Sequence, residues 1–303
     1  MINLVRNIAP VTVMGGTGDD TLIANGNPTV FDNLRHTPTG LGAGTVINDN
    51  QPFPVITFTG IEHLKLVLQS GEGDGARVDG TIGDDRFRFF HGATADAGMI
   101  IGTLDQNNAT GGGPFALTET TYSGDDPVPN DVDINFFVPG GSDTIEFNGT
   151  SGDDVISVGI GEGGGAQLSN SLAGVVVSRV EAFNMASADV QGAGGNDVFS
   201  VAPSQFVAIN VFGGLPAPPA VPGDELKVNV AGTLGGNLTV STNASGKFGS
   251  FTFTNRMKVA FQEIETIATG TCPGLTCALV VGAAARKQQG AGAFDLPLTL
   301  SIP

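Results

Sequence analysis

"GTSGDDVISV", residues 149–158, places two glycines and two adjacent aspartates in front of an alternation of apolar and polar residues. Alternation with a period of two is typical of a β-strand that buries one face. Asp and Gly favour tight turns, because Asp accepts hydrogen bonds from nearby backbone N–H groups and Gly adopts a positive φ without strain. The stretch therefore predicts a turn that starts a strand.

The same pattern occurs four times in the chain. The other copies are "GGTGDDTLIA" at 15–24, "GTIGDDRFRF" at 80–89 and "GAGGNDVFSV" at 192–201. A second recurrent element has an apolar residue, then a glutamate, then alternation; its glutamates are Glu62, Glu181 and Glu265. A third element, in 140–149 and 222–232, again places Asp directly before an alternating stretch. The chain is thus built from repeated turns that start strands.

The stretches between these turns predict an all-β fold. They are short, rich in Val, Ile, Phe and Thr, and bounded by Gly, Pro, Asn or Asp. Turns of one chemistry, repeated, favour a parallel β-solenoid, because stacking places like turns above one another. Several small β-sandwich domains in tandem are the alternative. In either case the phenylalanines of "FRFF" at 87–90 and "NFF" at 135–137 are expected in the core.

Three regions follow from this pattern. Residues 1–13 form an N-terminal segment that could serve as an assembly contact, and residues 14–270 form the repetitive scaffold, with units starting near 15, 80, 149 and 192. Residues 271–303 form a turn with two cysteines and an apolar tail. The tail after Phe294 either adds as a strand to a neighbouring subunit or returns to its own core.

The charge balance excludes some partners. Lys and Arg number 13 and Asp and Glu number 30, giving a formal net charge of −17, so a row of phosphates would not be neutralised and nucleic acid is not expected. No apolar run approaches the ~20 residues that span a bilayer. The first residues lack the apolar core of a signal peptide, so export would need a removed signal or a signal-free route.

The motif "GTSGDDVISV", the stretch from "LRHTPTGLGAGTVINDN" to "ITFTGIEHLKL", and "VFGGLPAPPAVPGDELKVNV" resemble repeats of large secreted bacterial surface proteins related to the haemolysin-type calcium-binding family. The resemblance implies an extracellular location, a β-roll-like architecture and calcium held between stacked turns. The copies here are isolated, whereas the repeats of that family stand in tandem. The resemblance covers most of residues 14–270.

Calcium is therefore an expected cofactor. The candidate ligands are the paired residues of the four turns: Asp19, Asp20, Asp84, Asp85, Asp153, Asp154, Asn196 and Asp197. Calcium takes six to eight oxygens, so turns from different coils would have to converge, for instance those at 153–154 and 196–197. In the alternative interpretation these residues only build turns: the first residue of each pair caps the turn and the second orients the start of the strand.

Enzymatic activity is not expected. Adjacent residues of a strand point to opposite faces, which suits a catalytic carboxylate pair poorly, and a fourfold repeat is unlike an active site. The basic candidates for a polysaccharide lyase or hydrolase, Arg86, Arg88, Arg179 and Lys227, are scattered in the sequence. The three histidines are too far apart to suggest a metal set. A polysaccharide-active β-helix enzyme remains the second alternative.

Cys272 and Cys277 flank a Pro-Gly turn and predict a disulfide in an oxidising compartment. Together these features predict a secreted structural protein that assembles with copies of itself, or is displayed, at the bacterial surface as a filament, sheath, surface layer or adhesin module. The alternative is a calcium-dependent adhesion module that contacts polysaccharide.

Overall fold

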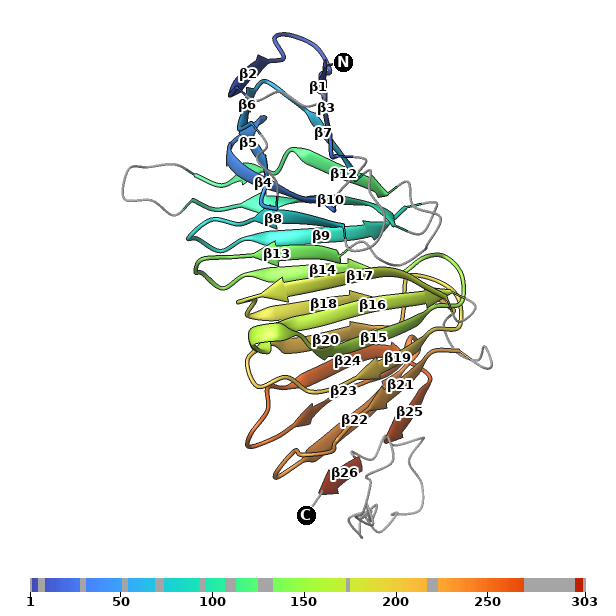
Figure 1. Cartoon of the computed structure of the whole chain (residues 1–303). Coiled ribbons are helices and arrows are strands. Elements are labelled where there is room, and N and C mark those ends of the chain that lie inside the picture. Colours follow the sequence, from blue (N-terminus) through green and yellow to red (C-terminus); the bar gives the residue numbers. More distant parts are fainter. Residues whose placement is uncertain are drawn as a thin grey trace, which may run out of the picture.

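Two large β-sheets form the molecule. The computed structural model describes residues 2–4, 9–27, 31–50, 54–68, 74–92, 96–106, 113–124, 133–172, 175–216, 223–269 and 298–301. Within these residues the chain contains one short 3₁₀ element, η1 (Glu162–Gly164), and is otherwise strands, turns and loops. No helix of the described part is long and apolar enough to cross a membrane. The strands stack as successive rungs between the two ends of the chain (Figure 1).

Sheet A has 14 strands. In sheet order they are β1 (Ile2–Leu4), β3 (Thr21–Asn25), β7 (His63–Leu68), β12 (Glu119–Gly124), β10 (Ala97–Leu104), β9 (Arg86–His91), β14 (Thr144–Asn148), β18 (Ser187–Gln191), β20 (Ala208–Phe212), β24 (Val259–Ile264), β23 (Gly246–Thr252), β22 (Asn237–Asn243) and β26 (Leu298–Ser301), with β11 (Phe115–Ala116) beside β10.

Sheet B has 12 strands. In sheet order they are β2 (Val11–Met14), β6 (Ile56–Thr59), β5 (Ala43–Asn48), β4 (Asn33–Gly40), β8 (Gly75–Asp79), β13 (Asp133–Phe137), β17 (Val175–Phe183), β16 (Ala166–Leu172), β15 (Val155–Ile160), β19 (Val198–Val201), β21 (Glu225–Val228) and β25 (Thr266–Thr269). The chain passes repeatedly between the two sheets, so the all-β, solenoid-like fold expected from the repeated turns is confirmed.

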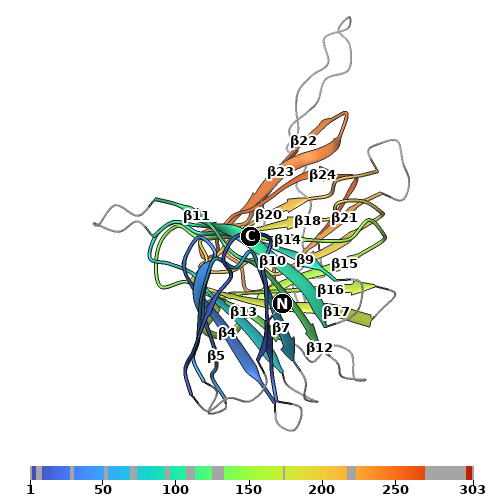
Figure 2. The same ribbon diagram turned by 90° about the horizontal axis from the view of Figure 1, so that it is seen from above.

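Four meanders interrupt the parallel order. They are β4–β5–β6, β9–β10–β12, β15–β16–β17 and β22–β23–β24. The first strand of each is separated by two strand positions from the earlier strands of its sheet, and the next two strands fill this gap, each antiparallel to the one before it. The third strand of each meander pairs in parallel with an earlier strand: β12, for example, pairs with β7. Parallel neighbours elsewhere come from successive passes, such as β18 and β20. Figure 2, turned by 90°, shows the strands of the two sheets layered over one another.

The core lies between the inner faces of the sheets. Strand alternation decides which side chains enter it: Phe87 and Phe89 of β9 are fully buried and so is Phe136 of β13. Phe90 and Phe137 point outward, and the side chain of Phe137 is 38% exposed. The expectation that the whole of "FRFF" and "NFF" is core is therefore wrong for these two rings, because neighbouring residues of a strand face opposite sides. Within the core, Phe89 stacks with Phe147, and their ring centroids lie 5.3 Å apart.

The C-terminal strand returns to its own chain. β26 pairs antiparallel with β22, with Thr239 opposite Thr299. This corresponds to the second of the two expectations for the tail. The predicted disulfide between Cys272 and Cys277 lies outside the described residues.

Candidate functional site

The acidic pairs sit at the corners where the chain enters a strand. The four turns lead directly into β3, β9, β15 and β19. The first residue of each pair lies toward solvent: Asp19 is 81% exposed, and Asp84 and Asp153 are exposed as well. The second residue faces inward, and the side chains of Asp85, Asp154 and Asp197 are buried.

The inward residues form a ladder along the stack, here called the inner ladder. The backbone N–H of Asp154 donates to Oδ1 of Asp197 at 2.8 Å, and the N–H of Asp197 donates to Oδ1 of Asp224 at 2.8 Å. The N–H of Asp224 then donates to Oε2 of Glu265 at 2.7 Å. Each carboxylate thus binds the residue that starts the neighbouring strand, which fixes the register between coils. Three more rungs have the same geometry: Asp20 to Glu62, Asp32 to Asp74, and Asp85 to Asp143.

The exposed residues form a second ladder that runs the opposite way, here called the outer ladder. Oδ1 of Asp153 accepts the backbone N–H of Asn196 at 2.8 Å, and Oδ1 of Asn196 accepts the N–H of Gly223 at 2.9 Å. Oδ1 of Asp84 likewise accepts the N–H of Ser142 at 2.8 Å. Two adjacent residues therefore bind the same neighbouring coil, one as donor and one as acceptor. The first residue of the pair acts through its side-chain oxygen and the second through its backbone N–H.

The turn itself is closed by the second residue of the pair. The carboxylate of Asp154 accepts the backbone N–H of Thr150 at 2.6 Å and also contacts the hydroxyl of Thr150. The side-chain amide of Asn170 donates to the same carboxylate at 2.8 Å. The prediction that the first residue caps the turn is thus wrong. The first aspartate points to solvent and the next coil, because adjacent side chains at the start of a strand diverge.

Glycines make room for these carboxylates and for the adjacent backbone. A Cβ on Gly149 would lie 2.7 Å from Oδ2 of Asp154 and 2.7 Å from the carbonyl oxygen of Gly192. The glycine directly before the acidic pair has a positive φ in the first and fourth copies, 132° at Gly18 and 122° at Gly195, as predicted. Gly152 of the third copy does not adopt such a φ, so there the expectation of a left-handed glycine is wrong.

Burial raises the pKa of two carboxyl groups of the inner ladder, Asp197 and Asp224. The pKa of Asp197 is raised to about 8, mainly by burial, with a smaller contribution from the carboxylates of Asp224 and Asp154 and against the lowering effect of the hydrogen bond from the Asp154 backbone N–H. Burial likewise raises the pKa of Asp224 to about 6. In the fourth copy Ala193 replaces the threonine that closes the turn in the third copy, so Asp197 lacks that hydroxyl donor. Oδ2 of Asp197 has no hydrogen-bond partner among the described residues.

Of the four pairs proposed as calcium ligands, all of them among the described residues, only those at 153–154 and 196–197 contact each other, whereas Asp20 contacts Glu62 and Asp85 contacts Asp143. Asp153 and Asp154 lie against Asn196 and Asp197 through the hydrogen bonds of the two ladders. Within the described ranges, however, no group of three or more His, Cys, Asp or Glu residues is arranged to hold a metal ion. The convergence foreseen for a metal is used here to bind backbone N–H groups.

The repeated sequence elements predicted only some of the residues of the ladders. Glu62 and Glu265, from the glutamate-containing element, accept the backbone N–H groups of Asp20 and Asp224. Glu181, from the same element, instead lies within β17 and accepts a hydrogen bond from Gln167. The rung from Asp32 to Asp74 was missed, because neither residue belongs to a repeated motif. The available signal was an Asp directly before a strand.

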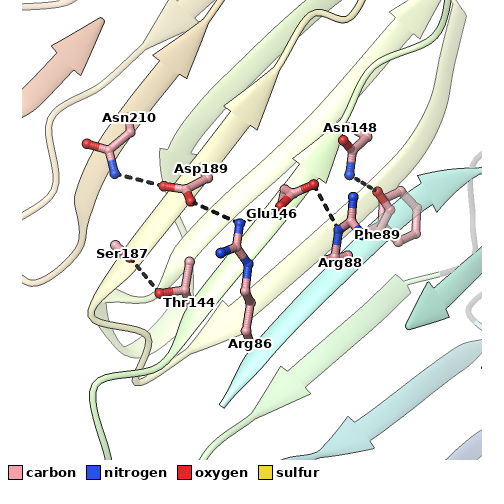
Figure 3. A network of polar contacts seen from close by, with 9 residues as sticks. All are labelled: Arg86, Arg88, Phe89, Thr144, Glu146, Asn148, Ser187, Asp189 and Asn210. Carbon is pink, nitrogen blue, oxygen red and sulfur yellow. Dashed lines mark hydrogen bonds and ion pairs between the residues drawn. The ribbon is translucent and has the colours of Figure 1, made fainter. Parts of the chain in front are cut away.

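A second polar site lies on the outer face of sheet A (Figure 3). Arg86 and Arg88 of β9 both bind Glu146 of β14, at 2.7 Å and 3.0 Å. Arg86 also lies 3.9 Å from Asp189 of β18, whose Oδ1 accepts the side-chain amide of Asn210 at 2.7 Å. Burial raises the pKa of Glu146, but the two arginines outweigh it and leave this pKa below its ordinary value. Arg86 and Arg88, which looked scattered in the sequence, thus meet at one carboxylate.

The three histidines occupy separate places in the fold. His36 is fully buried and its Nδ1 lies 3.1 Å from the hydroxyl of Thr120, and burial lowers its pKa to about 3. His91 contacts Ser178 at 2.6 Å, and burial lowers its pKa to about 4. His63 lies on the outer surface between Asp19 and Glu119, and the hydrogen bond to Glu119 is the largest cause of its raised pKa. The two inner histidines bridge the two sheets as neutral groups.

No protein-family model matches the sequence, and no curated protein matches it. The arguments for function accordingly rest on the geometry of the corners, the sheet faces and the ends of the stack.

Proposed function

We propose that this chain is a secreted structural protein that assembles end to end with copies of itself at the bacterial surface. The observation that carries the proposal is the state of the two ends of the stack. β2 and β25 are the outermost strands of sheet B, and no described strand covers their outer edges. Uncovered edges offer unpaired N–H and C=O groups to another strand.

The direction of the strands favours such stacking. Along sheet B, β25 runs in the same direction as β2, because the four antiparallel steps within the two meanders cancel. β2 of one copy can therefore pair in parallel with β25 of the next and continue the pattern of the sheet. A contact between two different edges is heterologous, and repetition of it gives open fibres.

Proline at Thr12 is expected to block this contact. At the two ends of the β2–β6 pairing, the N–H of Val11 donates to the carbonyl oxygen of Val55 at 3.0 Å, and the N–H of Gly15 donates to that of Thr59 at 2.9 Å. Alternate residues of an edge strand point their N–H groups the other way, so Thr12 directs its N–H to the open edge, and its side chain is exposed. Thr12→Pro removes that donor but leaves the hydrogen bonds between β2 and β6 in place. We expect filaments of the wild type under the electron microscope and short or single particles for this variant.

The control is Thr12→Ala, which keeps the N–H and should assemble like the wild type. A wild-type chain that stays monomeric in sedimentation at high concentration, or a proline variant that forms filaments as the wild type does, would contradict assembly through β2.

Calcium stays a prediction. The exposed carboxylates of Asp84 and Asp153 each already accept an N–H from the next coil, so an ion would have to share them. If calcium binds the folded state, it raises the melting temperature by mass action. Thermal melts in excess calcium and in excess chelator measure this directly. A rise of several degrees with calcium supports a bound ion, and coincident curves assign the aspartates to the turns and ladders alone.

A further inference from the structure

The outer face of sheet A carries aligned rows of side chains. The parallel register across β9, β14, β18, β20 and β24 places Arg88, Glu146, Asp189, Asn210 and Ala260 in one row. A second row lies two residues further along each strand and contains Phe90, Asn148, Gln191, Phe212 and Gln262. Because neighbouring strands lie about 4.8 Å apart, each row is a regular series of groups that runs along the stack.

A hollow opens where the first row becomes small. Ala260 has no side chain beyond Cβ, and an open hollow of about 220 Å³ is lined by residues 210–212 of β20 and 260–262 of β24. Phe212 is half-buried with an outward ring, and Gln262 is exposed. Asn210 donates its amide nitrogen to Asp189, and in Figure 3 its amide oxygen points away from Asp189. The hollow thus combines an aromatic ring with two side-chain amides.

This combination suits a ligand rich in hydroxyl groups. Side-chain amides donate and accept hydrogen bonds, which matches hydroxyls, and an aromatic ring covers the apolar face of such a ligand. The charges beside the hollow are balanced, because Arg86 and Arg88 are paired with Glu146 and Asp189. The molecule as a whole carries −17 and repels acidic polymers. A neutral ligand is therefore favoured over a charged one.

We propose that the hollow around Asn210, Phe212 and Gln262 binds neutral polysaccharide. The rows on either side extend the contact along the stack, so a chain of sugars can lie across successive strands. The site is on a sheet face and not at an end, so it does not depend on the end-to-end assembly proposed above. Sequence composition gave no sign of it, since the aromatic group is a phenylalanine brought to the outer face by strand alternation.

Affinity electrophoresis of the full-length protein tests this inference. Native gels contain dextran, starch, galactomannan or xylan as neutral probes and alginate as an acidic probe. At least one neutral polysaccharide should retard the wild type. Gln262→Ala and Phe212→Ala should each weaken the retardation about tenfold or more. Gln262 is exposed and no hydrogen bond of its side chain is seen within the described residues, so its variant should melt like the wild type.

The control is Gln205→Ala, which removes another exposed glutamine, in the loop after β19; it should be retarded like the wild type. Three results would overturn the proposal. They are no retardation by any of the neutral polysaccharides, equal retardation of the Gln262 and Gln205 variants, and retardation by alginate alone that disappears with added salt.

Discussion

Gly213→Ala should destabilise the protein by about 3 kcal/mol or more, or prevent it from folding. A Cβ at this position would lie 1.8 Å from the carbonyl oxygen of Glu263 and 2.5 Å from Oδ2 of Asp224. Neither group can give way easily. The backbone oxygen of Glu263 belongs to the next strand, and Asp224 is held in the inner ladder. Urea denaturation followed by circular dichroism measures the loss.

Gly152→Ala is the matched control, because it also changes a glycine at an acidic corner. Its Cβ would find only the hydroxyl of Thr150 within 4 Å, at 3.7 Å, and its φ is not in the left-handed region. We expect a change within about 0.5 kcal/mol. Equal losses for the two variants would show that the close approach of successive coils does not require Gly213.

Replacement by asparagine should destabilise the protein at Asp154 but not, at low pH, at Asp197. Asp154 accepts hydrogen bonds from Thr150 and Asn170, so Asp154→Asn brings an amide NH₂ among donors and should cost about 2–3 kcal/mol at pH 7. Asp197 accepts one hydrogen bond, 2.8 Å long, from the backbone N–H of Asp154, and the oxygen that accepts it is retained in asparagine. Asp197→Asn should therefore be neutral within about 0.5 kcal/mol at low pH, where the carboxyl is protonated in both states.

The pH dependence of stability separates the same two residues. The pKa of Asp197 is raised from 3.8 to about 8 in the folded protein, so the folded state keeps a proton that the unfolded state loses. Its contribution to stability is complete below pH 4 and is lost as the pH rises toward 8. The wild type should lose several kcal/mol more stability than Asp197→Asn between these limits. Denaturation midpoints of both proteins at pH 4.5 and 8.5 give the comparison. Parallel curves would show that Asp197 is ionised in the folded state.

The sequence foretold the strands and the turns because these depend on local chemistry. The alternation in "VISV" and the Gly-Asp turn before it are sufficient to place β15 and its start. The arrangement of the strands could not be read in the same way. The pairing of β12 with β7 joins residues more than 50 positions apart, and no local pattern shows that the chain runs back through β10 to make it.

For the candidate sites as well, local features could be predicted from the sequence and long-range contacts could not. The acidic pairs were visible in the sequence, but their function as ladders was not, because each rung joins two turns that are far apart in the chain, such as Asp85 and Asp143. The hollow at Phe212 and Gln262 depends on the register of β20 and β24, which is a property of the pairing alone. Phenylalanine in a strand gives no indication of the face it occupies until the inward positions are known.

The backward meanders also constrain how the chain can be synthesised and shortened. When β9 leaves the ribosome, no earlier strand of sheet A lies beside it; it gains β10 next, and the folded part becomes continuous only when β12 reaches β7. The nascent chain thus closes its sheets in steps of three strands and not one strand at a time. Natural or engineered shortening should accordingly be tolerated after β6, β12, β17 or β24, where a meander is complete, and a break after the first strand of a meander leaves a gap two strands wide.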